Sequence, residues 1–417
     1  MRRIADTALD GALESAGAVL IEGPKWCGKT RTAEEKAASS LFMQDPDHTE
    51  SYLKAVDTKP SLLLKGDTPR LIDEWQMAPA LWDAVRFAVD RRGESGQFIL
   101  TGSTVLEDNA VLHTGTGRFS RILMRPMSLF ESLESNGAVS LKALFDKADA
   151  DAECVSSLTI EALALALARG GWPASVGQKE SAALRRVYDY VDAVINIDVS
   201  RVDDVKKSPA RIRALMRSLA RNVSTAASIA TIRADIAGAD ETVSDKTISG
   251  YLNALRRIYV VEDLPAWNPA MRSKTALRCS PKRHFVDPSI AAAVLRASPD
   301  GLLSDFSTFG LLFESLCIRD LRVYAGAIDG EVFHYRDKSG LEADAIVHLK
   351  DGRWGAVEVK TGAKEIEAAA ENLKALCGKV NLDKMKEPSF LMVLTGGELG
   401  YRRSDGVYIV PVGCLRD

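Results

Sequence analysis

Residues 23–30 read Gly-Pro-Lys-Trp-Cys-Gly-Lys-Thr, a complete match to the phosphate-binding pattern G-x-x-x-x-G-K-[ST]. Its glycines let successive backbone N–H groups turn inward around phosphates, and the helix that follows directs the positive end of its dipole at the same anion. An apolar run at 18–21 and an Ala/Glu/Lys-rich run at 30–39 predict the strand and helix that such a loop joins. The motif therefore predicts a nucleotide site within a doubly wound α/β sheet.

The side chains of this loop have distinct expected roles. The Lys29 amine is expected to reach the β and γ phosphates as a catalytic group, and the Thr30 hydroxyl is expected to hold Mg²⁺. ATP and Mg²⁺ are the predicted cofactors. The expected nucleotide contacts are Gly23, Pro24, Lys25, Trp26, Cys27, Gly28, Lys29, Thr30 and Arg31.

Two carboxylates end the apolar strand predicted at 70–74. Asp73 is placed to bind Mg²⁺, and Glu74 to polarise the attacking water as a catalytic residue. Such a pair alone is typical of a solvated strand end, but its position after a phosphate loop favours the catalytic interpretation.

A third predicted strand, at 97–103, ends in hydroxyl groups. Ser103, or alternatively Thr101, could sense the γ phosphate through a hydrogen bond, and a simple strand-terminating turn is the other interpretation. Arg118 could stabilise the charge that develops during γ-phosphate cleavage, as a finger supplied in trans by a neighbouring subunit of a homo-oligomer. The alternative for Arg118 is a solvated surface arginine.

The order of these motifs resembles that of prokaryotic AAA+ ATPases of the archaeal-ATPase type. The resemblance rests on G-P-K-W-C-G-K-T, L-I-D-E-W-Q, F-I-L-T-G-S, T-G-R and R-P-M-S-L-F-E. Members of that group carry a carboxy-terminal domain of uncharacterised function, and Gly-Gly-Trp-Pro at 170–173 is similar to the link beyond their ATPase core. The resemblance covers nearly the whole chain and implies an architecture, but it leaves the physiological role open.

Charge is distributed unevenly along the chain. The net charge is −3, yet residues 201–290 contain 16 Lys plus Arg against 9 Asp plus Glu. A basic segment between acidic flanks is the asymmetry expected if one module contacts a polyanion.

The same basic segment has a helix-turn-helix pattern. Ser224 is expected to cap a first helix and Ser244 a second, with the turn at 240–242. Strands of a wing are expected at 259–261 and within 274–285. DNA would contact Lys246, Arg256 and Arg257, mainly through its backbone. Winged-helix modules also serve in packing between domains, which is the alternative interpretation.

The carboxy-terminal third predicts a hairpin of strands at 341–347 and 354–359. Strand alternation puts Glu358 and Lys360 on one face, and Asp344 can face the same cleft from the neighbouring strand. This region resembles PD-(D/E)xK nucleases without the initial proline, and Glu314 matches the helical acidic residue of such sites. The resemblance implies that Asp344 and Glu358 bind Mg²⁺ and that Lys360 steadies the nucleophile and the developing charge.

These features predict an α/β protein with four parts. They are a P-loop AAA+ core at 1–150, a helical lid at 151–200, a winged-helix-like basic domain at 201–288 and a restriction-endonuclease-like domain at 289–417. The amino terminus lacks a signal-peptide core and no apolar stretch approaches ~20 residues, so a cytoplasmic protein without a membrane partner is expected. The scattered cysteines and histidines have no zinc spacing.

The predicted function is an ATP-hydrolysing AAA+ protein whose carboxy-terminal half faces DNA and carries a Mg²⁺-dependent nuclease-type site. The alternative is an ATP-gated binding or signalling switch whose nuclease-like domain recognises a partner and cuts nothing. A small-molecule kinase with the same loop is a third option, but the paired carboxylates and the long carboxy-terminal part count against it.

Overall fold

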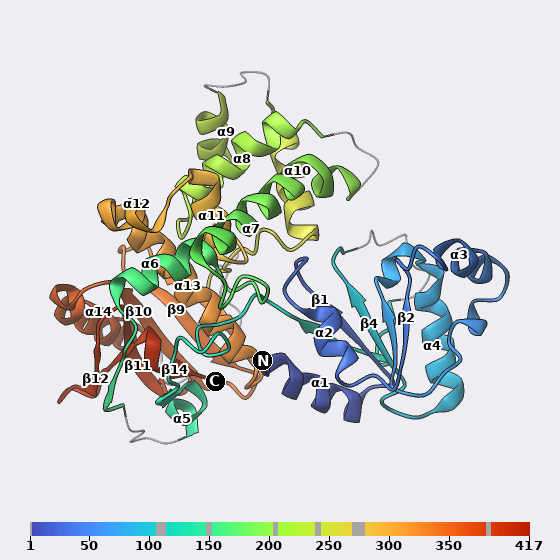
Figure 1. Cartoon of the computed structure of the whole chain (residues 1–417). Helices are drawn as coiled ribbons and strands as arrows, with labels where there is room; N and C mark the ends of the chain where they lie inside the picture. The colour runs from blue at the N-terminus through green and yellow to red at the C-terminus, as the bar shows by residue number, and fades with distance from the viewer. Residues whose placement is uncertain are drawn as a thin grey trace. The chain divides into compact units, whose positions relative to one another are not determined.

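The computed structural model describes residues 2–105, 114–146, 152–202, 207–237, 243–268, 280–380 and 385–417 (Figure 1). The chain forms two compact units. The amino-terminal unit comprises Arg2–Pro126 with Arg257–Tyr259, and the carboxy-terminal unit comprises Met127–Arg256 with Val260–Asp417. Among the described helices, none combines the length and the apolar character needed to cross a membrane.

A parallel five-stranded sheet forms the centre of the amino-terminal unit. Neighbouring strands pair in parallel throughout, and the outer strands are β2 and β5. Because β1 is covered on both faces, it is a continuous apolar run, as is usual for parallel strands. The order is β2 (Ser39–Phe42), β3 (Arg70–Asp73), β4 (Phe98–Gly102), β1 (Ala18–Glu22) and β5 (Phe119–Leu123).

Helices cover both faces of this sheet. Leu20 of β1 packs in one apolar cluster with α4 (Ala80–Arg92), while Val19 packs in another with α1 (Ile4–Ser15) and α2 (Lys29–Glu34). The helix α3 (Thr49–Thr58) contributes Val56 to the first cluster. This three-layer arrangement confirms the predicted parallel α/β fold of the P-loop core.

A mixed seven-stranded sheet organises the carboxy-terminal unit. Strands β13, β11 and β10 run parallel, and the remaining pairs are antiparallel. Helix α13 (Phe306–Gly326) packs against β8, β9 and β10, and α14 (Ile366–Lys379) packs against β9, β10 and β11. The order is β7 (Cys154–Val155), β12 (Leu399–Arg402), β13 (Tyr408–Pro411), β11 (Phe390–Thr395), β10 (Trp354–Lys360), β9 (Glu342–Leu349) and β8 (Gly330–Arg336).

Helices form the rest of this unit. The buried helix α11 (Pro288–Leu295) packs against α6 (Ile160–Arg169), α7 (Glu180–Ala193) and α8 (Pro209–Arg221). The predicted lid helices therefore pack within the carboxy-terminal unit. Its division into lid, winged-helix and nuclease-like domains stays a prediction. The shorter elements are α5 (Leu141–Asp146), α12 (Pro299–Ser304) and a parallel pair, β6 (Val139–Ser140) with β14 (Leu415–Arg416).

The two helices expected in the basic segment are present as α9 (Ile229–Ala237) and α10 (Asp245–Arg257). The Ser244 hydroxyl accepts the N–H of Thr247 at 3.2 Å, as expected of a cap. The cap expected at Ser224 was wrong, because Ser224 has a φ of 63° and donates its hydroxyl to the carbonyl of Leu311. Ser228 caps α9 instead, through Thr231 N–H at 3.1 Å.

The stretches expected to form a wing contain isolated bridges and no assigned strand among their described residues, so the wing stays a prediction. Isolated antiparallel bridges join Val261 to Phe285 and Leu264 to Lys282. The predicted turn at 240–242 and residues 274–279 of the expected second strand lie outside the described residues.

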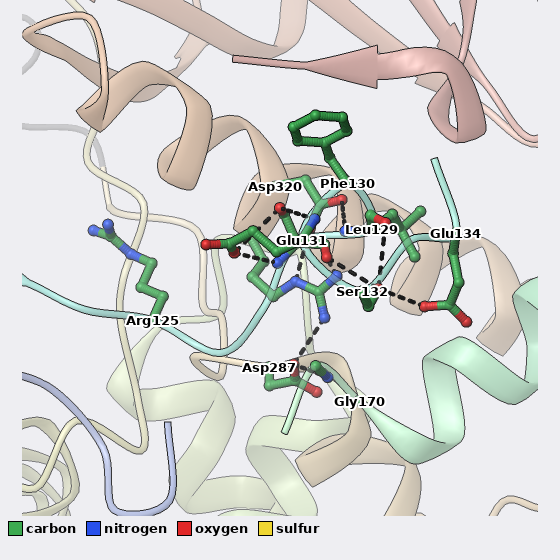
Figure 2. A network of polar contacts seen from close by, with 12 residues as sticks. Arg125, Leu129, Phe130, Glu131, Ser132, Glu134, Gly170, Asp287 and Asp320 are labelled. Atoms are coloured by element: carbon green, nitrogen blue, oxygen red, sulfur yellow. Dashed lines mark hydrogen bonds and ion pairs between the residues drawn. The ribbon is translucent and has the colours of Figure 1, made fainter. Parts of the chain in front are cut away.

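A buried polar network joins two motifs that the sequence singled out (Figure 2). Arg319 of α13 pairs with Asp287 at 2.8 Å and with Asp320 at 2.7 Å. Asp320 accepts the N–H of Leu129, and Asp287 accepts the N–H of Gly171, both at 3.0 Å. Leu129 of the R-P-M-S-L-F-E motif and Gly171 of the Gly-Gly-Trp-Pro link therefore share one arginine-centred network within the carboxy-terminal unit.

Candidate functional site

The phosphate loop connects the carboxyl end of β1 to α2. Gly23 has a φ of 147° and Gly28 a φ of 103°, which a residue with a β-carbon rarely adopts. A Cβ at Gly23 would lie 2.1 Å from the Met124 carbonyl oxygen, so this close backbone approach requires glycine. The buried Lys29 amine donates to the carbonyls of Gly23 at 3.0 Å and Pro24 at 2.8 Å.

The Arg3 side chain binds the backbone of the phosphate loop, a role that no pattern in the sequence indicates. Its guanidinium donates to the Cys27 carbonyl at 2.7 Å and to the Arg125 carbonyl at 2.8 Å. The Cys27 thiol donates to the Met124 carbonyl at 3.4 Å. The Cys27 side chain is thus buried against the backbone of Met124.

Asp73 lies fully buried at the carboxyl end of β3, with the hydroxyls of two threonines on the same oxygen. Thr30 Oγ1 donates to Asp73 Oδ1 at 2.7 Å, and Thr101 Oγ1 donates to it at 2.6 Å. Gln44 donates to the other oxygen at 3.4 Å. Hydroxyl and carboxylate oxygens are ligands that Mg²⁺ accepts, so Thr30 and Asp73 fit the predicted metal.

Glu74 follows Asp73 in a left-handed conformation, with a φ of 55° and a ψ of 46°. This conformation is uncommon for residues other than glycine and directs Glu74 out of the strand. Ser103 donates its hydroxyl to the Glu74 carboxylate at 3.2 Å, and the Gln76 amide also donates to it. The two predicted hydroxyl sensors therefore serve different carboxylates: Thr101 contacts Asp73 and Ser103 contacts Glu74.

Four other predicted residues of this unit are exposed or pair with side chains outside this group. Lys25, Trp26 and Arg31 are exposed, and Arg31 pairs with Glu35 at 3.3 Å. Arg118 precedes β5 and pairs with Asp90 at 2.7 Å. Because all strands run parallel and Arg118 sits at the amino end, it lies at the sheet edge opposite the phosphate loop of its own chain.

A second charged cluster forms in the carboxy-terminal unit, from residues that the sequence predicted to meet. Asp344 of β9 accepts the Val359 N–H at 2.9 Å, and Lys360 of β10 pairs with Glu358 at 2.7 Å and with Asp344 at 3.7 Å. Glu358 also accepts the Asn372 amide of α14 at 2.7 Å. We call Glu314, Asp344, Glu358 and Lys360 the carboxylate cluster.

Lys282 enters the carboxylate cluster from its antiparallel bridge with Leu264, which we call the Leu264 bridge, and sequence reasoning missed it. Its ammonium lies 2.7 Å from a Glu314 oxygen and 3.2 Å from an Asp344 oxygen, with 9% of the side chain exposed. Lys282 follows a Pro in a basic stretch, so its sequence context indicated only a surface lysine.

Burial and mutual repulsion shift the pKa values of this cluster. Burial, followed by the neighbouring Asp344 charge, raises the pKa of Glu314 to about 8 and that of Glu358 to about 7. Burial disfavours ionisation of Asp344 too, but Lys282 and Lys360 hold its pKa below the usual value. Asp344 is therefore the most strongly ionised acid of the cluster.

The three residues expected to contact DNA differ in how far their side chains already bind other groups of the protein. Arg256 pairs with Asp263 and donates to Asn253 at 2.8 Å, and Arg257 donates to the Val105 carbonyl at 3.0 Å. Lys246 is exposed near the start of α10. Of the three predicted contacts, Lys246 presents its charge to solvent most openly.

Comparison with known families covers three stretches. Residues 15–133 match the AAA domain family, residues 160–301 match a domain of unknown function (DUF8612) and residues 309–415 match another (DUF4143). No curated protein sequence matches the chain.

The solved structures that are similar to this chain include two of low sequence identity. A Walker-type ATPase of Pyrococcus abyssi is 14% identical with a TM-score of 0.42, covering 70% of this chain and 94% of its own. A DNA polymerase III gamma subunit-related protein of Thermotoga maritima is 11% identical with a TM-score of 0.24, covering 62% of this chain and 100% of its own. With the phosphate-loop geometry and the family match together, the chain contains an AAA-type P-loop ATPase domain over residues 15–133.

Proposed function

We propose that the amino-terminal unit binds ATP and hydrolyses it with Mg²⁺. The observation that carries this proposal is the pairing of Thr30 with Asp73 beside a Lys29 amine that donates to carbonyls of its own loop. Lys29 can exchange these neutral acceptors for charged phosphate oxygens, which form stronger hydrogen bonds. Thr30 and Asp73 would hold Mg²⁺, which neutralises the charge of the β and γ phosphates.

Glu74 is the residue that we assign to the attacking water. Its carboxylate can accept a proton from water or orient it, and the Ser103 hydroxyl lies on that carboxylate. Ser103 can thereby respond to both the γ phosphate and the water-positioning group.

Replacing Lys29 tests the proposal. The variant Lys29→Ala is expected to lose ATP hydrolysis by about 10²–10³-fold, because one preorganised charged donor is removed from the transferring phosphoryl group. Phosphate release is measured with Mg²⁺ present, and Lys54→Ala, which removes an exposed lysine from α3, is the control. Equal rates for wild type and Lys29→Ala would refute the assignment.

We also propose that Arg118 acts in trans within a homo-oligomer. Its place at the sheet edge opposite its own phosphate loop supports a role at another subunit's nucleotide. Mixing Arg118→Ala with Lys29→Ala subunits is expected to restore activity, since some interfaces then combine an intact loop with an intact arginine. Full activity of Arg118→Ala alone would exclude the finger.

For the carboxy-terminal unit, we propose partner recognition without cleavage, with DNA as the partner. The ammonium of Lys282 among the carboxylates favours this alternative over a nuclease. Supercoiled plasmid is expected to stay intact with wild-type protein and Mg²⁺ or Mn²⁺. Nicking that Lys360→Ala and Asp344→Asn both abolish would establish cleavage instead.

The DNA contact is tested at the exposed start of α10. Lys246→Glu is expected to weaken binding of a labelled duplex and to reduce its salt dependence by about one counterion, because a phosphate contact is lost. Fluorescence anisotropy at several salt concentrations measures both effects, and Lys338→Glu, which changes an exposed lysine elsewhere in the unit, is the control. Identical curves for all three proteins would remove α10 from the interface.

A further inference from the structure

The carboxylate cluster already holds two ammonium groups. Lys360 comes from the same strand as Glu358, whereas Lys282 arrives from a distant part of the chain and contacts Glu314 and Asp344. Helix α13, which carries Glu314, lies beside β9, which carries Asp344 (Figure 1). The Lys282 ammonium thus bridges the two elements whose carboxylates would otherwise face each other.

The backbone holds Lys282 in this position. Its N–H donates to the Leu264 carbonyl at 3.0 Å, and its carbonyl accepts the Leu264 N–H at 2.9 Å. The next residue, Arg283, pairs with Asp263 at 2.8 Å and donates its N–H to the Thr225 carbonyl at 2.8 Å. Because the backbone of Lys282 and of Arg283 is held in place, the Lys282 ammonium can leave the cluster only by rotating its own side chain. That rotation breaks its ion pairs with Glu314 and Asp344.

Both carboxylate oxygens of Asp344 and of Glu358 already have nitrogen donors as partners. Asp344 gives one oxygen to Lys282 and the other to the Val359 N–H, while Glu358 gives one to Asn372 and the other to Lys360. Mg²⁺ requires near-octahedral oxygen ligation, and a fixed ammonium at the same carboxylates opposes it by charge and by volume. Over the described residues, no group of three His, Cys, Asp or Glu side chains is arranged to hold a metal ion.

We propose that Lys282 is the resident cation of the carboxylate cluster, where it takes the place of a divalent metal and connects the Leu264 bridge to α13 and β9. The Lys282 ammonium then occupies the position that a metal ion would take, and its ion pairs with Glu314 and Asp344 stabilise the packing of the Leu264 bridge against α13 and β9. Removing the Lys282 ammonium opens a divalent-cation site that the wild-type protein lacks. Lys282, Glu314 and Asp344 all belong to the carboxy-terminal unit, and their pairing does not depend on ATP hydrolysis.

The test is a titration of the nucleotide-free full-length protein with Mn²⁺, followed by electron paramagnetic resonance. Lys282→Met is expected to bind one additional Mn²⁺. Its affinity should exceed any Mn²⁺ binding at the wild-type cluster by at least about tenfold, because the positive charge of Lys282 no longer repels the ion. The double variant Lys282→Met/Asp344→Asn is expected to lose the gain. Lys350→Met, which removes an exposed lysine paired with Asp329, should bind as wild type does.

Stability supplies a second measurement if Lys282→Met is weakly folded. Mn²⁺ is expected to raise the melting temperature of Lys282→Met, but not that of wild type or of the double variant, because an ion that binds only the folded state stabilises it. Lys282→Gln, which keeps a donor but no charge, is expected to show the same gain in part. A wild-type Mn²⁺ site that Asp344→Asn removes, or a folded Lys282→Met with no new site, would overturn the proposal.

Discussion

The two units of this chain each bring lysines and buried acids together, but they satisfy them in opposite ways. In the phosphate loop, Lys29 donates to neutral carbonyls, and Asp73 accepts from the neutral hydroxyls of Thr30 and Thr101. In the carboxylate cluster, Lys282 and Lys360 pair directly with acids. The first arrangement leaves charges that a nucleotide and a cation can neutralise, whereas the second already contains its counterions.

The largest effect is expected from removing the buried counterion. Lys282→Met should lower the free energy of unfolding by about 3–5 kcal/mol, because it leaves buried acids without their partner. Lys29→Met should cost only about 1–2 kcal/mol, because the amine leaves two neutral carbonyls. Urea denaturation followed by circular dichroism measures both. Equal losses for the two variants would erase the contrast between the sites.

The next effect concerns the acid at the end of β3. Glu74→Gln should keep ATP binding but lower hydrolysis by about 10²-fold, because the amide cannot accept the proton of water. Calorimetric ATP titration and single-turnover hydrolysis separate the two steps. The matched variant Glu358→Gln, in the filled cluster, should leave hydrolysis unchanged, and a comparable loss there would contradict the division of roles.

A smaller effect is expected from pH. The folded-state pKa values of Glu314 and Glu358, about 8 and about 7, lie above the unfolded value near 4.5, so the folded state retains protons that the unfolded state has lost. Stability should therefore fall as pH rises from 5 to 8, on the order of 2 kcal/mol for Glu314. Glu314→Gln, which cannot ionise, should show a flatter profile in urea denaturation. Parallel profiles would show that Glu314 titrates normally.

The smallest effect is expected from removing the contact of Arg3 with the phosphate-loop backbone. Arg3→Leu removes the donor to the Cys27 carbonyl and should raise the KM for ATP about threefold with little change in kcat, since the loop is less well positioned for binding. Steady-state kinetics separate the two constants, and Arg3→Lys should recover part of the loss. A fall in kcat at constant KM would show that Arg3 acts on the chemical step.

Local motifs predicted the amino-terminal unit well. The loop and its strand occur where the sequence placed them, because a glycine pattern and a β1 run buried on both faces are local requirements of a parallel sheet. The helix begins as expected at the loop but ends at Glu34, short of the predicted run at 30–39, and Ser39 already belongs to β2. The meeting of Asp344, Glu358 and Lys360 also followed from strand alternation. Residues whose contacts are distant in sequence were missed or wrongly placed: Ser224 binds the Leu311 carbonyl instead of capping a helix, and Arg3 binds the phosphate loop.

By itself, the sequence determined which chemical groups this protein has and which strand ends carry them, because glycine turns, alternation and apolar runs act over a few residues. Only the tertiary structure decided which charges are compensated. Lys282 is 62 residues from Asp344, and the bridge to Leu264 brings it there. No local pattern in the sequence indicates the partner of a buried charge. Only the folded chain therefore shows that Lys29 of the phosphate loop binds neutral carbonyls, whereas the carboxylate cluster already contains its counterions.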